Sequence, residues 1–253
     1  MAPKSFPHVD SLDTQTRLYF AALLLAQVSR LPVSPTRGMT LSLMGDLRDA
    51  ALILVPWPCS DWTLEVRAER TPIEDLQWRP YVGAGRFGEL LDLLRKSLQL
   101  LPFDDKGNTV RVELWKQLSS AEASLFFERQ LRKHQFDVAW AQDLLYAQRD
   151  CPHPLSIASW CYCCWAATRH GASIAQQQRA PDATLVREAI YAELQRRMSY
   201  LAAGKWANCA FPPPVAEPKN AIGKIFVSDL APMGMEFWTV PASLEGLIKA
   251  SND

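Results

Sequence analysis

The segment "DATLVREAIYAELQRRMSYLAAG", from Asp182 to Gly204, has the most regular apolar pattern in this chain. Its apolar residues recur every three or four positions, which places them on one face of an α-helix. Gly204 stands where a residue in the left-handed conformation commonly ends a helix. We therefore predict a helix over 182–203 that buries one stripe of side chains: Val186, Ile190, Leu194, Met198 and Leu201.

The same periodicity continues from this segment toward the N-terminus. Asp13 can cap a further helix that runs to Arg30. Ser119 and Glu122 have the spacing of a capping box, in which the two side chains satisfy free amides at the start of a helix. The predicted helical bundle, at 117–209, therefore contains these helices: 120–134, 136–148, 154–170 and 182–203.

Segments on both sides of the bundle are rich in β-branched and aromatic residues, which is typical of short strands. Pro56 and Pro58 restrict the first of them to a short or edge strand, because proline cannot donate a ladder hydrogen bond. The order of elements, mixed, then helical, then mixed again, favours an α+β protein. The predicted strands are "ALILVPWP" (51–58), "WTLEVRA" (62–68), "TVRVELW" (109–115), "KIFVS" (224–228) and "MEFWTV" (235–240).

Prolines mark the clearest boundary in the chain. The segment "AFPPPVAEPKN", from Ala210 to Asn220, is predicted to be a linker, since proline fixes φ and cannot donate within a helix or a sheet. We see no internal repeat at a fixed period. The predicted parts are a mixed α/β region with a few short strands (1–116), a central helical bundle (117–209), a proline-rich linker (210–220) and a short C-terminal segment that contains strands (221–253).

Composition limits the classes of function that the chain can serve. Its 253 residues are 48% hydrophobic, and its 27 Lys and Arg balance 27 Asp and Glu. The chain can bury a sizeable core, and no net charge draws the whole molecule to nucleic acid or to an anionic membrane. The N-terminus lacks the pattern of a secretory signal, and the longest apolar run, Leu18 to Ala26, is too short to span a bilayer. We expect a cytoplasmic protein without membrane contact.

The six cysteines are spaced irregularly, and three of them fall in "CYCC" at 161–164. This spacing is a poor disulfide framework and fits a reducing compartment. Cys161 and Cys164 have the two-residue gap of a zinc knuckle, but the same offset places two small apolar side chains on one helix face. We interpret them as core residues and expect no metal or other cofactor, although the sequence leaves zinc binding at this pair open.

Gly83, Gly85 and Gly88 have the spacing of the dinucleotide-binding loop of the Rossmann fold. In that fold the glycines let the backbone approach a pyrophosphate at a helix N-terminus. The resemblance implies a nucleotide ligand and gives Glu113 the ribose-binding position. The segment before the loop, "DLQWRPY", has charged residues and a proline where a buried strand is expected. We interpret the loop as a turn that starts a helix and keep a nucleotide-binding enzyme as an alternative.

Arg129 and His134, in "RQLRKH", are five positions apart at the end of a predicted helix. The pair resembles the arginine–histidine motif of HEPN ribonucleases over six residues. The resemblance implies that His134 acts as general acid or base and Arg129 as an anion clamp around an RNA phosphate. A solvated basic helix end that complements the helix dipole explains the same residues. We favour this second interpretation and keep the ribonuclease as an alternative function.

Positive side chains recur along the predicted bundle helices, with Tyr200 and Trp206 close to them in the sequence. If the bundle gathers these side chains on one side, they form a surface suited to phosphate contact and base stacking. We therefore predict a non-catalytic subunit or adaptor of a larger intracellular assembly, with protein partners and contact to DNA or RNA. The predicted nucleic-acid-binding residues are Arg129, Arg132, Lys133, Arg169, Arg196, Arg197 and Lys205.

Overall fold

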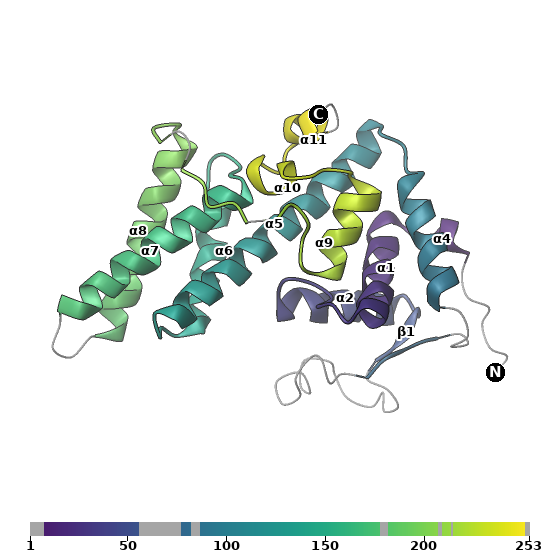
Figure 1. Ribbon diagram of the computed structural model, residues 1–253, viewed down its shortest axis with the longest axis horizontal. Coiled ribbons are helices and arrows are strands. Elements are labelled where there is room, and N and C mark those ends of the chain that lie inside the picture. The colour runs from purple at the N-terminus through teal and green to yellow at the C-terminus, as the bar shows by residue number, and fades with distance from the viewer. Residues whose placement is uncertain are drawn as a thin grey trace. The chain divides into compact units, whose positions relative to one another are not determined.

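The computed structural model describes residues 8–55, 77–81, 87–177, 182–206, 209–213 and 215–250. Most of these residues are helical, and the described strands form one small sheet. In that sheet β1 (Ile53–Leu54) pairs antiparallel with β2 (Arg79–Pro80), and Ile53 lies opposite Pro80. The predicted α+β class is therefore wrong, because the chain is mostly helical (Figure 1).

The chain divides into two compact units, and the division falls inside the long helix α5 (Asp105–Lys133). Unit 1 consists of Met1–Arg111 and Glu217–Pro232, and unit 2 of Val112–Ala216 and Met233–Asp253. Each unit therefore combines two separate segments of the sequence.

Unit 1 is built around α1 (Thr14–Ser29). The Asp13 carboxylate caps this helix by accepting a hydrogen bond from the Thr16 amide at 2.9 Å, and Arg30 ends it with a left-handed φ of 53°. The helix predicted from Asp13 to Arg30 is thus confirmed. Among the described residues, no helix combines the length and apolar content needed to cross a membrane. The helices packed on α1 are α2 (Arg37–Asp49), α4 (Phe87–Gln99) and α9 (Ala221–Ile225).

A buried arginine ties three parts of unit 1 together. Arg111 is only 1% exposed, and its guanidinium donates to the carbonyls of Leu230 at 2.7 Å, Pro102 at 2.8 Å and Leu101 at 2.8 Å. The Phe103 ring lies 3.9 Å from the guanidinium carbon. Buried carbonyls need hydrogen-bond donors, so this one side chain stabilises the backbone in both sequence segments of unit 1.

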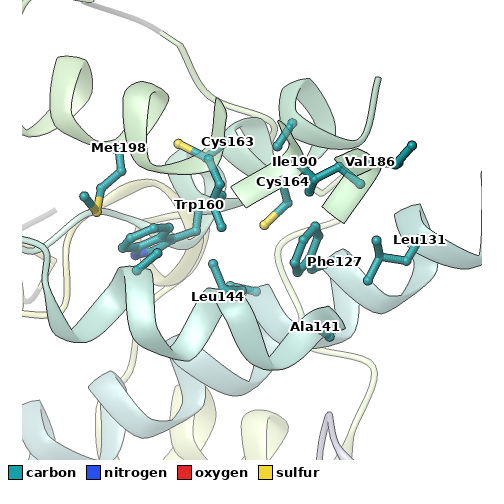
Figure 2. Close-up of a cluster of buried hydrophobic side chains, with 14 residues drawn as sticks. Phe127, Leu131, Ala141, Leu144, Trp160, Cys163, Cys164, Val186, Ile190 and Met198 are labelled. Carbon is teal, nitrogen blue, oxygen red and sulfur yellow. The ribbon is translucent and has the colours of Figure 1, made fainter. Parts of the chain in front are cut away.

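Unit 2 contains a helical bundle with one apolar core, shown in Figure 2. Phe127 from α5, Leu144, Trp160 and Ile190 are each at most 5% exposed, so each bundle helix buries one face against the others. The remaining elements of unit 2 are η3 (Val138–Ala141), α6 (Gln142–Arg149), α7 (Ile157–Gln177), α8 (Ala183–Ala202), α10 (Glu236–Thr239) and α11 (Leu244–Ala250).

Helix α8 agrees with the helix predicted over 182–203. Gly204 follows it with φ at +66°, and its amide donates to the Leu201 carbonyl at 2.9 Å, as in a left-handed helix end. The helix packs closely against α7 because Gly171 has no side chain: a Cβ there would collide with Cγ1 of Ile190. Helices α7 and α8 lie side by side (Figure 1).

Several predicted strands are wrong. "TVRVELW" lies inside α5, where Arg111, Trp115 and Leu118 are buried at helical spacing. Such a short run fits both periods, and packing along one helix face decides between them. Ser119 and Glu122 also lie within α5, so they do not start a helix. The segments "KIFVS" and "MEFWTV" fall in α9, in the π-helix η4 (Phe226–Leu230) and in α10, so the predicted C-terminal strands are wrong too. The segment at 62–68 lies outside the described residues.

Candidate nucleic-acid interface

A surface groove of about 660 Å³ lies between α7 and α8 in unit 2. Small side chains from both helices, Ala166, Ala189 and Ala192, leave the space open. Positions one helical turn apart on α7 then bring Trp165 and Arg169 to the same groove. The charged or titratable residues that line it are Arg169, His170, Glu193, Arg196 and Arg197.

Glu193 orients two of these arginines. Arg196 donates to its carboxylate through Nε and Nη2, both at 2.7 Å, and Arg197 donates through Nε at 2.6 Å. Burial raises the pKa of the Glu193 carboxyl, but the hydrogen bonds from Arg196 and Arg197 outweigh it and keep the pKa below its usual value. The groove therefore presents three guanidinium groups, those of Arg169, Arg196 and Arg197, against one ionised carboxylate.

Aromatic side chains also contact Arg197 and the nearby Lys205. Arg197 donates to the Tyr162 hydroxyl at 2.6 Å, and its guanidinium carbon lies 4.8 Å from the ring centre of Trp206. The Trp206 ring stacks on Tyr200 at 4.8 Å, and the Lys205 ammonium lies 5.3 Å from the Tyr200 ring. These contacts restrict the rotamers of Arg197 and Lys205, so less side-chain entropy remains to be lost on binding an anion.

Arg169 of α7 acts electrostatically on His134, which lies just past the end of α5. Burial lowers the pKa of His134, and the positive charges of Lys133 and Arg169 lower it further. Arg169 therefore lies within electrostatic reach of the α5 end as well as on the groove. Arg132 forms an exposed ion pair with Glu128 at 3.3 Å, which leaves its guanidinium accessible to solvent.

The structure brings some of the sequence-predicted residues together and separates others. Arg169, Arg196 and Arg197 line one groove, and Lys205 adjoins it through Tyr200. The residues Arg129, Arg132 and Lys133 occupy the last turns of α5 and do not line the groove.

A further arginine of α8 has a structural partner. Arg187 donates to both carboxylate oxygens of Asp143 on α6, at 2.9 and 2.7 Å. This two-point contact joins α6 to α8, and Arg187 does not line the groove.

Sequence reasoning named Tyr200 and Trp206 as aromatic partners but missed Trp165 and Phe211. Trp165 lines the groove, with the Arg169 guanidinium 5.0 Å from its ring centre and the Phe211 ring stacked on it at 6.2 Å. The four-residue spacing of Trp165 and Arg169 on a helix was a usable signal. Phe211 had no such signal, because it lies in the predicted linker. In the structure its backbone amide donates to the Ala158 carbonyl at 2.8 Å, which holds the segment against α7.

The arginine–histidine pair of α5 shows no direct contact. Arg129 is exposed on the helix, whereas His134 lies just past its end and stacks on Phe136 at 6.0 Å. In the part of the chain that the structure describes, Arg129 has no hydrogen bond to His134. The ribonuclease alternative therefore stays a prediction.

The glycine loop falls largely outside the described residues, which exclude Gly83 and Gly85. Gly88 lies in the first turn of α4, and Glu113 lies inside α5. The strand before the loop, β2, pairs antiparallel with β1, whereas a dinucleotide-binding βαβ unit has parallel strands. The described residues around the loop thus differ from that unit, and nucleotide binding stays a prediction.

The cysteines of α7 belong to the bundle interior. Cys163 and Cys164 are fully buried among apolar side chains such as those of Phe127 and Ile190 (Figure 2), and Cys161 is 6% exposed. Burial raises the pKa of Cys163 to about 12 and also raises the pKa values of Cys161 and Cys164 above the ordinary thiol value, so these thiols stay protonated. Within the described ranges, no group of three or more His, Cys, Asp or Glu side chains could hold a metal ion.

These geometric features stand without support from relatives. Comparisons with protein families, with curated proteins and with solved structures find no match to this chain. The functional proposal is therefore based on the chain's own residues.

Proposed function

We propose that this chain is a non-catalytic subunit that binds DNA or RNA through the α7–α8 groove. The observation that carries this proposal is the meeting of Arg169, Arg196 and Arg197 from two helices on one groove, with a single carboxylate among them. Arg169 can bind phosphate oxygens through paired hydrogen bonds, whereas Arg196 and Arg197, whose guanidinium groups also donate to Glu193 and Tyr162, contribute positive charge and their remaining N–H groups. Clustered cations supply most of the non-specific affinity of proteins for nucleic acids.

The position of Arg169 supports a phosphate-binding role over a structural one. It forms no ion pair or hydrogen bond with any described residue, whereas Arg187 on the neighbouring helix is held by a carboxylate. Its charge also adds to that of Lys133 at the α5 end. A phosphate chain that leaves the groove past Arg169 toward the end of α5 would approach Lys133.

Charge reversal at Arg169 tests the proposal. We expect wild-type protein to bind a fluorescein-labelled oligonucleotide, with affinity that falls steeply between about 50 mM and about 200 mM salt. Arg169→Glu should weaken binding about tenfold and lower the slope of log Kd against log salt concentration by about one. Fluorescence anisotropy measures both quantities.

Arg149→Glu is the matched control, since Arg149 is 73% exposed on α6 and does not line the groove. It changes the net charge of the same unit by the same amount. Equal losses in Arg149→Glu and Arg169→Glu, or no binding of any oligonucleotide by the wild type, would contradict the proposal.

A ribonuclease is the second candidate, and one observation favours it. Burial and the positive charges of Lys133 and Arg169 lower the pKa of His134, which favours its neutral form, the form that can accept a proton. Incubation of labelled RNA with the wild type and with His134→Ala tests this alternative. Cleavage that disappears in the variant would replace the non-catalytic proposal, and intact RNA in both would exclude the ribonuclease.

A further inference from the structure

The groove is bordered by aromatic rings as well as by cations, and this combination limits the form of nucleic acid that suits it. Trp165 lines the groove itself, and Arg169 lies over its ring at 5.0 Å. Tyr162 and Phe211 lie next to Trp165, with ring centres 6.0 and 6.2 Å away. Because Arg169 is exposed and already contacts the Trp165 ring, a base can stack on the guanidinium plane or take its place against the ring.

Base stacking on protein side chains requires an unpaired base. In a duplex the base faces are covered by neighbouring base pairs, so a duplex can use the arginines of this groove but not Trp165. A single strand can use both, because its phosphates and its base faces are accessible together.

The size of the groove agrees with a single strand. About 660 Å³ lies within the range of pockets that enclose small ligands, so it holds on the order of one or two nucleotides. The alanines that leave this space, Ala166, Ala189 and Ala192, carry no polar side-chain atom that could read a base edge. The polar side chains that line the groove are mostly cationic, and Arg196 and Arg197 occupy the one carboxylate, that of Glu193. This lining favours contacts to phosphates and base faces, which every sequence shares.

We propose that the α7–α8 groove binds single-stranded nucleic acid without sequence preference, with one base stacked against Trp165 and Arg169 and the adjacent phosphate bound by Arg196 and Arg197. This inference rests on the proposed function and specifies its ligand. Glu193 acts as a positioning residue, since it fixes the orientation of the two phosphate-binding guanidinium groups.

The test compares a labelled single strand of about ten nucleotides with the duplex of the same sequence by fluorescence anisotropy. We expect the single strand to bind at least about tenfold more tightly than the duplex. Trp165→Leu should weaken single-strand binding about tenfold without changing the salt slope, because it removes stacking and no charge. Trp165→Phe keeps an aromatic face and should bind the single strand nearly as tightly as the wild type. That result would show that the loss in Trp165→Leu comes from the missing ring and not from a damaged fold.

Tyr146→Leu is the matched control for loss of an aromatic ring. Tyr146 is 50% exposed on α6, has Arg149 over its ring at 5.5 Å and does not line the groove. It should leave the affinity unchanged. Photocrosslinking with a 5-iodouracil oligonucleotide, followed by mass spectrometry, should place the crosslink on Trp165.

The outcomes separate this inference from the proposed function. Equal affinity for duplex and single strand, with Arg169→Glu still impaired, would overturn the single-strand inference and leave nucleic-acid binding in place. A Trp165→Leu variant that binds as wild type would do the same. Competition by poly-glutamate as strong as that by the oligonucleotide would overturn both, because the groove would then be a general anion site.

Discussion

The buried arginine of unit 1 and the groove arginines of unit 2 use the same side chain in opposite ways. Arg111 is 1% exposed and donates three hydrogen bonds to backbone carbonyls within its own unit. In the groove, the side chains of Arg196 and Arg197 are 49% and 24% exposed and share one carboxylate, that of Glu193. The first arrangement stabilises the fold, and the second leaves charge accessible to a ligand.

This difference shows that a count of positive residues says little about nucleic-acid binding. Both units are rich in arginine, yet burial and partner type decide whether a guanidinium is available. Arg95 in unit 1 is intermediate between the two arrangements, because it donates to both carboxylate oxygens of the buried Asp229 while its own side chain is 40% exposed. Substitutions at the two kinds of arginine should therefore separate effects on stability from effects on binding.

The largest expected effect is on stability in Arg111→Met. Removal of the guanidinium leaves the carbonyls of Leu230, Pro102 and Leu101 without this donor, so we expect the free energy of unfolding to fall by about 3 kcal/mol or more. Urea denaturation followed by circular dichroism measures the loss. Arg169→Met is the control and should change stability by less than about 0.5 kcal/mol. Similar losses in both variants would remove the distinction between the two kinds of arginine.

A smaller loss is expected from Gly171→Ala, which tests the packing that shapes the groove. The new Cβ would collide with Cγ1 of Ile190, and overpacking of this kind costs about 1–3 kcal/mol, more than the gain in helix propensity. In an Ile190→Ala background the same substitution should not lower the free energy of unfolding, since Cγ1 of Ile190 is absent. Equal costs in the two backgrounds, measured by urea denaturation, would show that α7 and α8 do not meet at this pair.

An effect of about 1 kcal/mol is expected for the pH dependence that Glu193 confers. Its pKa is lowered in the folded protein, so its stabilisation is complete above the ordinary value of 4.5 and is lost as the pH falls through the lower folded value. Glu193→Gln removes this dependence. The stability difference between wild type and variant should therefore shrink on acidification from pH 7 to about pH 3. Parallel pH profiles would show that the two arginines do not hold an ionised Glu193.

The smallest effect is expected for Arg132→Ala at the end of α5. Its ion pair with Glu128 is exposed and joins neighbouring turns of one helix, so its loss should change the free energy of unfolding by less than about 0.5 kcal/mol. Thermal denaturation measures the shift. A larger loss would mean that the basic end of α5 stabilises the fold, as Arg111 does, and is less available to a ligand.

Parts of the fold and of the candidate site were predictable from the sequence because their signals are local. The Asp13 cap and the apolar stripe of α8 each depend on residues within a few turns, and both are confirmed. Arg169, Arg196 and Arg197 were recognised as exposed cations of helices for the same reason. Phe211 was not recognised as part of the site, because its place beside Trp165 depends on where a proline-rich segment packs.

The sequence alone determined the helical bundle, the helix ends at Asp13 and Gly204 and the helices that carry each cation, since periodicity and capping act over a few residues. Only the tertiary structure decided that "TVRVELW" is helical, that Arg111 is buried, and that cations of α7 and α8 share one groove with Trp165. A short apolar run fits a strand or a helix equally well, and burial against distant segments selects between them. Convergence of side chains from two helices likewise depends on close packing at Gly171, which no local pattern specifies.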